Sequence, residues 1–276
     1  MWDRIEPLMP ADPVRGRRWA DHRRTLEAIA WKYRTCSPWR DLPDELGSFQ
    51  AAHKRLVRWA VDGTWERILA AVLTEAEGAD DISWTVSVDS TVCRAHQHAA
   101  GARKKGIPGR AEPDDHALGR SRGGLSTKVH LASDGQARPL ALRITAGQAG
   151  DAPAFETVMA GIRVLRSGPG RPRTRPDAVL ADRAYSSRAI RNHLRRRGIR
   201  AVIPQPSDPI GHRLRRGRAG GRPPAFDAEA YKQRNAVERS INRLKQWRGL
   251  AMRTDKLAID YQAALHLAAI LTWARR

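Results

Sequence analysis

The spacing of the apolar residues changes near residue 80, and this change limits the folds open to the chain. Before it, apolar residues recur at helical spacing, as Leu26, Ile29 and Tyr33 do. An acidic segment of small residues follows at 75–81, and over 85–89 apolar and polar residues alternate as in a β-strand. The sequence therefore predicts an all-α domain over 1–78 and an α/β domain over 79–276.

The α/β region shows five strand patterns, with helices between and after them. Strands are expected at 85–89, 125–131, 140–145, 178–182 and 201–203, and helices at 152–165, at 186–197 and near the end of the chain. The first three strands are expected to form an antiparallel meander. The whole pattern argues for an α/β layer sandwich around a mixed five-stranded sheet flanked by helices. Two basic stretches, 99–122 and 207–224, are expected to be loops.

The chain is strongly basic, because 50 Lys and Arg residues against 29 Asp and Glu residues give a net charge of +21 over 276 residues. This charge favours a polyanionic partner, with nucleic acid the first candidate and an anionic membrane the weaker rival. Three short helices are predicted within 19–73, the last two separated at Gly63 and Thr64. They suit a helix-turn-helix-like DNA-binding unit, although a plain basic bundle stays open. The basic residues expected on their solvent faces are Arg23, Arg24, Lys32, Arg34, His53, Lys54, Arg55 and Arg58.

Two further features bear on where the protein acts. Only two cysteines occur, Cys36 and Cys93, without the spacing of a zinc site or a disulfide framework, which fits the reducing cytoplasm. The N-terminus lacks the pattern of a signal peptide. The most apolar stretch, 257–273, contains Asp260, Gln262 and His266, so we expect a buried core helix there and no membrane span. A cytoplasmic protein is predicted.

Carboxylates stand at the ends of two predicted strands, where a basic chain has little reason to place them. Asp89 ends the first strand and Asp182 ends the fourth. Each is either paired with a neighbouring Arg or Lys, or reserved for a metal ion. A third acid, Glu238, lies on a predicted helix at the border between an apolar stripe and an open surface.

The helix around Glu238 carries an unusual stripe of functional groups. At about 100° per residue, Tyr231, Arg234, Glu238 and Lys245 fall within an arc of roughly 60°. An amphipathic helix with an Arg234–Glu238 ion pair would explain the acid and one base. It would not explain the full stripe.

This run resembles the Y-R-E-K signature of bacterial insertion-sequence transposases of the DDE type, and is most similar to insertion-sequence family five. The similarity extends to the segments around Asp89 (V-D-S-T), Lys128 (G-G-L-S-T-K) and Asp182 (L-A-D-R-A-Y), and it covers nearly the whole chain. It implies an RNase H-like catalytic fold with one Asp on the first strand, the second Asp after the fourth strand, and the Glu on a late helix.

The resemblance also implies the chemistry. Asp89, Asp182 and Glu238 would be the catalytic residues and would hold Mg²⁺, with Mn²⁺ as a substitute, as a pair of ions roughly 3.5–4 Å apart. They would hydrolyse a strand at the element's ends and transfer the freed 3′-hydroxyl into target DNA. The residues expected to contact DNA phosphates are Tyr231, Arg234, Lys245, Arg239 and Lys128.

The partners that the resemblance implies are double-stranded DNA, as transposon ends and target, and a second copy of the chain in a homodimer on paired ends. Action at the bacterial nucleoid is expected. Two rival functions stay open. One is an RNase H-like DNA nuclease that does not transpose, and the other is a catalytically inactive DNA-binding relative.

Overall fold

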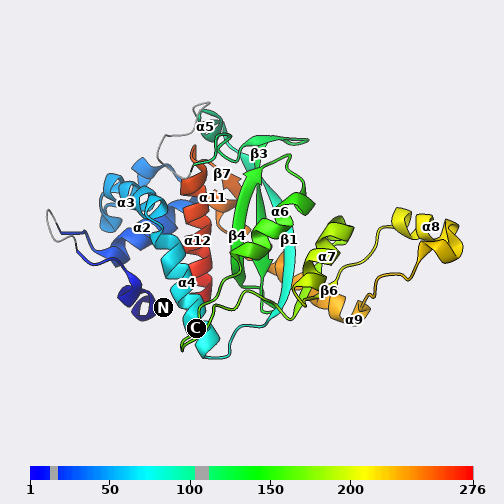
Figure 1. The fold of residues 1–276 in the computed structure, drawn as a ribbon. Coiled ribbons are helices and arrows are strands. Elements are labelled where there is room, and N and C mark those ends of the chain that lie inside the picture. The colour runs from blue at the N-terminus through cyan, green and yellow to red at the C-terminus, as the bar shows by residue number, and fades with distance from the viewer. Residues whose placement is uncertain (13–17, 103–111, 276) are drawn as a thin grey trace.

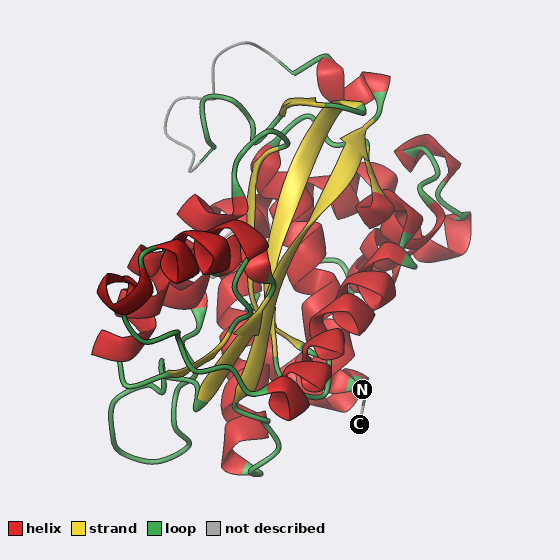
Figure 2. Ribbon diagram, turned by 90° about the vertical axis from the view of Figure 1, so that its right-hand side faces the viewer, coloured by secondary structure: helices red, strands yellow, loops and turns green. Residues whose placement is uncertain are grey.

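A computed structural model describes residues 1–12, 18–102 and 112–275. Its centre is one mixed sheet with helices on both faces (Figures 1 and 2). The five principal strands lie in the order β4-β3-β1-β5-β6; β3 and β4 run antiparallel to their neighbours, whereas β5 and β6 run parallel to β1. These strands are β1 (Thr85–Ala95), β3 (Gly124–Ser133), β4 (Pro139–Ala146), β5 (Ala178–Ala181) and β6 (Arg200–Val202).

All five predicted strands are confirmed, and so is the RNase H-like arrangement. The prediction that Asp89 ends the first strand is wrong, because β1 continues past it to Ala95. The predicted strand number of five is wrong, because the sheet has seven strands among the described residues. The additional strands are β2 (Gly119–Ser121), which pairs with the start of β3, and β7 (Met252–Arg253), which pairs with the end of β1. Segments of two or three residues are too short to show the alternation that identifies a strand.

Helices form a layer on each face of the sheet. On one face lie α6 (Asp151–Gly161) and α7 (Arg188–Arg196), and on the other lie α10 (Asn235–Lys245) and α12 (Ala258–Ala274). Helix α6 ends four residues before its predicted end, because Val164 instead forms an isolated β-bridge with Arg173. Short helical turns join the elements: α5 (Gln97–Ala100), η4 (Arg183–Tyr185), α9 (Ala228–Tyr231), η6 (Lys232–Arg234) and α11 (Arg248–Ala251).

The N-terminal region is helical, as predicted. It comprises α1 (Trp2–Ile5), η1 (Glu6–Leu8), α2 (His22–Thr35), η2 (Trp39–Asp41), η3 (Asp44–Leu46), α3 (Phe49–Val61) and α4 (Thr64–Gly78). Asp21 caps α2 by accepting hydrogen bonds from two backbone N–H groups of its first turn. The predicted break between the last two helices is confirmed at Gly63, which has a left-handed φ of 74°. Thr64 is the first residue of α4.

Helix α12 joins the N-terminal helices to the sheet. It packs against α3 and α4 on one side and against β4 on the other, so a single apolar core runs through both regions. Nearly all its residues are buried, which explains its low amphipathicity and confirms the expected core helix. Among the described residues, no helix is both long and apolar enough to cross a membrane.

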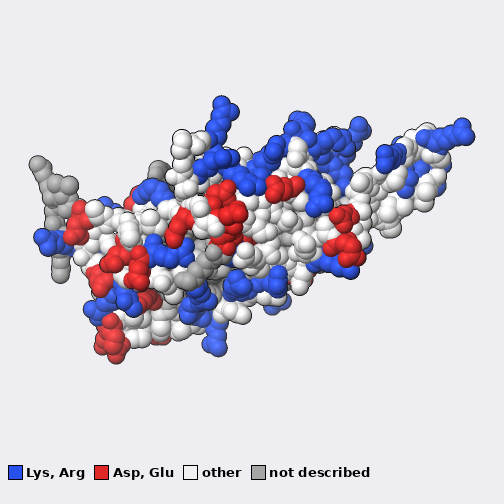
Figure 3. All heavy atoms as spheres, turned by 90° about the horizontal axis from the view of Figure 1, so that it is seen from below, with Lys and Arg blue, Asp and Glu red and all other residues white. Residues whose placement is uncertain are grey.

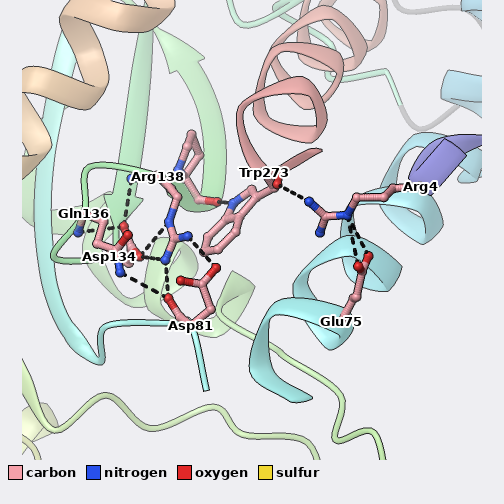
Figure 4. Close-up of polar contacts among 8 residues, drawn as sticks. Arg4, Glu75, Asp81, Asp134, Gln136, Arg138 and Trp273 are labelled. Carbon is pink, nitrogen blue, oxygen red and sulfur yellow. Dashed lines mark hydrogen bonds and ion pairs between the residues drawn. The ribbon is translucent and has the colours of Figure 1, made fainter. Parts of the chain in front are cut away.

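The C-terminal end of α12 is fixed by two arginines from opposite sides (Figure 4). The Arg138 guanidinium forms ion pairs with Asp134 at 2.6 Å and Asp81 at 2.8 Å, and lies 3.9 Å from the Trp273 ring. On the other side, Arg4 binds the Trp273 carbonyl at 3.1 Å and reaches α4 through an ion pair. These contacts hold α1, α4, α12 and the β3–β4 turn together.

Two expectations about basic residues are wrong. Lys32 and Arg55 are buried, not on a solvent face. Arg55 lies 3.8 Å from the Trp19 ring centroid, and Lys32 bonds to the Thr254 hydroxyl at 3.3 Å. Long cationic side chains can bury their stems against such neighbours, which helical periodicity alone does not reveal.

The predicted loop at 207–224 is also wrong over most of its length. It contains α8 (Ser207–Arg215) and η5 (Gly217–Gly220), which project from the body as an arm (Figure 1). In the other predicted loop, 99–122, residues 103–111 lie outside the described residues. The described parts of that loop include the end of α5 and all of β2.

Burial of His266 predicts a loss of stability in acid. Burial, followed by the Arg143 charge, lowers the pKa of His266 to about 4, against about 6.5 in the unfolded chain. Protonation therefore favours the unfolded chain, so stability is intact above pH 6.5 and is lost as the pH falls towards 4. We expect the wild type to lose about 2 kcal/mol from this group between pH 7 and pH 5. In urea titrations His266→Gln should lack this part of the loss; an unchanged pH dependence would contradict the assignment.

Candidate active site

The sheet brings two of the predicted catalytic acids together. Strands β1 and β5 run parallel, and Val88 of β1 pairs with Ala181 of β5. The next residues in each chain segment, Asp89 and Asp182, therefore emerge side by side. Asp89 stays in its strand, whereas Asp182 leaves the sheet and caps η4 by accepting the Ala184 N–H at 2.9 Å.

The third acid, Glu238, is linked to Asp89 by Arg234. Arg234 donates to Asp89 Oδ2 at 2.7 Å and to Glu238 Oε1 at 2.6 Å, so one guanidinium bridges the two carboxylates. The predicted continuous helix is wrong in detail, because the 3₁₀ turn η6 separates α9 from α10. Arg234 ends this turn and Glu238 lies in the first turn of α10.

The charges of the site favour a cation among the carboxylates. Burial raises the pKa of Asp89; the Ser90 N–H and Arg234 oppose this shift, and the negative charges of Asp182 and Glu238 add to it. Burial disfavours the charged form of Arg234, but its bond to Glu238 and the charge of Asp89 outweigh this and raise its pKa. The guanidinium thus supplies the positive charge that three neighbouring acids require.

Tyr231 lies beside the same group. Burial raises the pKa of its hydroxyl; Arg234 lowers it, and Asp182, Asp89 and Glu238 raise it further. Its ring contacts Phe226 at a centroid distance of 5.3 Å. The hydroxyl therefore remains a protonated donor next to the acids.

The remaining predicted DNA contacts occupy different positions. Lys245 ends α10 and donates to the Val92 carbonyl of β1 at 3.2 Å. Lys128, on β3, forms an ion pair with Asp151 at 3.1 Å. Arg239 is exposed on α10. The structure therefore gathers Asp89, Asp182, Glu238, Arg234 and Tyr231, with Lys245 and Lys128 reaching β1 and α6, and leaves Arg239 on the outer surface of its helix.

Sequence reasoning missed three residues near the acids: Ser90, Asp151 and Tyr185. Ser90 donates to Asp151 at 2.5 Å, and Tyr185 is buried in η4. Asp151 is the first residue of α6, where a helix favours a negative charge. That position alone gives a sequence no reason to place it beside Asp89.

The site has the donors for a hard divalent ion, but they are not gathered around one. Within the described parts of the chain, no three His, Cys, Asp or Glu side chains stand close enough to hold a metal ion between them. The Arg234 guanidinium occupies the position between Asp89 and Glu238. Carboxylate oxygens are the ligands that suit Mg²⁺, so the residue types fit such an ion although the described side chains do not enclose a site for one.

Two family models match the chain. Residues 1–69 match a putative transposase of the IS4/5 family, and residues 82–273 match the transposase DDE domain. The chain belongs to the DDE transposase family. The predicted family and enzyme class are thereby confirmed, and membership implies dependence on a divalent metal ion.

Curated relatives agree with this assignment. The transposase is 31% identical over 163 residues to the putative transposase for insertion sequence element IS402 of Burkholderia cepacia, which covers 59% of this chain and 69% of the relative. It is 26% identical over 151 residues to the putative transposase for IS6501 of Brucella ovis, over 55% of this chain and all of the relative. The crystal structure of the Mos1 strand transfer complex matches with 12% identity and a TM-score of 0.28, over 96% of this chain and 79% of that one.

The surface of the transposase suits a polyanion. Lys and Arg side chains gather on the part of the face shown in Figure 3 that lies towards the α8 arm. The arm itself has no buried residue in α8 or η5 and carries Arg213, Arg215, Arg216 and Arg218. Part of the positive charge of the chain therefore lies on this exposed arm, where it can attract a polyanion.

Proposed function

We propose that this transposase binds the terminal inverted repeats of an insertion sequence, hydrolyses a DNA strand at each end and transfers the 3′-hydroxyl into target DNA. Asp89, Asp182 and Glu238 would hold two Mg²⁺ ions, or Mn²⁺ in their place. When bound, such ions activate the attacking oxygen and stabilise the leaving oxygen. The observation that carries the proposal is that one guanidinium bridges Asp89 and Glu238, while Asp182 lies close enough for its charge to raise the pKa of Asp89.

The side chains around the acids would hold the DNA. Arg234 would bind a flanking phosphate as a two-pronged donor, and Lys245 would do so as a point charge. Tyr231 would position a phosphate through its hydroxyl or stack on a displaced base. Arg239 and Lys128 would contact further phosphates of the same duplex.

We also propose that residues 1–78 form the end-binding domain and residues 79–276 the catalytic domain. Within the first, α3 is the better candidate for contact with bases. Its exposed face carries His53, Lys54 and Arg58 beside a groove that reaches the start of α12, whereas a larger share of α4 is buried. A homodimer on paired ends would act at the nucleoid, in the cytoplasm.

The test uses purified protein, Mg²⁺ and duplexes ending in the inverted repeat that borders the gene, with shuffled ends as control. A transposase nicks the true ends and joins them to a target plasmid. A nuclease would cut both duplexes without joining, and an inactive relative would bind the true ends without cutting. Either of these last two results would overturn the proposal.

A further inference from the structure

A second polar cluster lies beside the three acids, on the opposite face of the sheet. Successive side chains of a strand point to opposite faces, so Asp89 faces Arg234 and Ser90 faces the layer that contains α6. The pairing of β1 with β3 places His130 and Lys128 on the same face as Ser90.

One carboxylate oxygen of Asp151 accepts hydrogen bonds from two side chains of this cluster. Ser90 Oγ donates to Asp151 Oδ1 at 2.5 Å, and Lys128 Nζ donates to the same oxygen at 3.1 Å. His130 Nδ1 lies 4.0 Å from it and, among the described residues, has no hydrogen-bond partner although the side chain is only 1% exposed. The ion pair is partly buried, with 13% of the Lys128 side chain and 28% of the Asp151 side chain exposed.

The cluster meets the catalytic acids at an open edge of β1. Strand β5 pairs with β1 only as far as Val88, and β7 pairs with it only from Arg94. In the part of the chain that the structure describes, the edge between these points has no neighbouring strand, and Asp89 and Ser90 stand at its beginning. A phosphate that reaches Asp89 along this edge is therefore also next to the Ser90 face.

Tyr185 lies close enough to both groups of acids for their charges to act on its hydroxyl. It is the last residue of η4, three residues after Asp182, and is buried. Burial raises the pKa of its hydroxyl, and the charges of Asp151, Asp89 and Asp182 raise it further. The Asp151 carboxylate thus acts on the same small region as two members of the trio.

The Lys128–Asp151 ion pair contributes little to stability but can fix the orientation of the Lys128 side chain. A partly buried ion pair stabilises a fold little, because desolvation offsets the attraction. An ammonium has three N–H donors, and the bond to Asp151 engages one of them. The bond fixes the direction of the side chain and leaves the other donors for phosphate oxygens.

We propose that Asp151 is a positioning residue of the active site, which aims the Lys128 ammonium at the phosphate on which Asp89, Asp182 and Glu238 act. The inference rests on the proposed function and deepens it. According to this proposal Asp151 is required for cleavage, although its negative charge would by itself repel a DNA phosphate.

The decisive variant is Asp151→Asn, which removes one negative charge from a DNA-facing site. Charge alone predicts equal or tighter DNA binding and no loss of activity. The positioning role predicts that single-turnover strand cleavage with Mg²⁺ falls about 10–100-fold, as for other groups that orient reactive ones, while the Kd for end DNA does not rise. Lys128→Met should lose a similar factor, and the double variant should lose no more than the worse single one.

A matched control is Glu156→Gln, which makes the same charge change on the exposed side of α6. It should cleave at the wild-type rate, and thermal melts should show all variants folded. The two single variants and the double variant can also be compared by their affinity for end DNA in the presence of EDTA. This comparison does not depend on cleavage. In this affinity assay, Lys128→Met should reduce the dependence of DNA affinity on salt concentration by the amount that corresponds to about one phosphate contact. The reduction should be smaller when Asp151→Asn is also present.

The outcomes separate the two proposals. Wild-type rates in Asp151→Asn, or independent effects of the two substitutions on affinity, would overturn the positioning role while the transposase function stands. A wild type that cuts no end DNA would instead overturn the proposed function, and the affinity cycle would still decide whether Asp151 and Lys128 act as a unit.

Discussion

Strand cleavage at a transposon end is expected to fall at least about a thousand-fold when Asp89, Asp182 or Glu238 is changed to its amide. Metal ions stabilise the transition state of such reactions by several kcal/mol, and each 1.36 kcal/mol corresponds to a factor of ten in rate. An amide keeps the size of the side chain but loses the charge that would hold a divalent ion. The measurement is single-turnover cleavage of a labelled end duplex.

DNA binding separates this loss from misfolding. Each amide variant removes a negative charge from a DNA-binding surface, so its affinity for the end duplex should be unchanged or higher. Glu229→Gln is the matched control, since this acid lies in α9 close to the site but pairs with Lys232 at the surface. Full cleavage by any one of the three amide variants would exclude that residue as a metal ligand.

Replacement of Arg253 by Met is expected to lower the free energy of unfolding by about 3–5 kcal/mol, because it removes a fully buried cation with several partners. Arg253 is 0% exposed and donates to the carbonyls of Asp255, His116 and Lys256 and to the Thr127 hydroxyl, at distances of 2.7 to 3.1 Å. Methionine fills much of the space but leaves these acceptors unpaired.

Urea titration measures this effect, and Arg248→Met provides the comparison. Arg248 begins α11 and is exposed, so its substitution should change stability by no more than about 0.5 kcal/mol. A similarly small change in Arg253→Met would show that solvent or neighbouring groups satisfy the buried acceptors, contrary to the network in the structure.

Local signals in the sequence were enough to locate the strands and the three acids. Period-two alternation marks β1, β3 and β4. Asp182 directly follows β5, whereas Asp89 ends only the apolar first part of β1, which continues to Ala95. Glu238 required the spacing of several residues along one helix. These features depend on residues close in sequence, so they can be predicted without knowledge of the tertiary contacts.

The contacts of the site depend on residues far apart in sequence, and these could not be predicted. The helical stripe suggested Arg234 as a partner of Glu238, but not that its other nitrogen binds Asp89, 145 residues away. Asp151 is likewise 61 residues from Ser90. The burial of Arg55 depends on Trp19 and Trp59, whose rings no helical periodicity places around it.

The packing of α12 against α3 and α4 has a consequence for synthesis on the ribosome. Helix α4 ends at Gly78 and α12 begins at Ala258, so at about 5–20 residues per second the early helices emerge roughly ten to forty seconds before the helix that covers them. During that interval the face of α4 that packs against α12 lacks its native cover. Nascent chains that stall before α12 should therefore be substrates for chaperones and proteases.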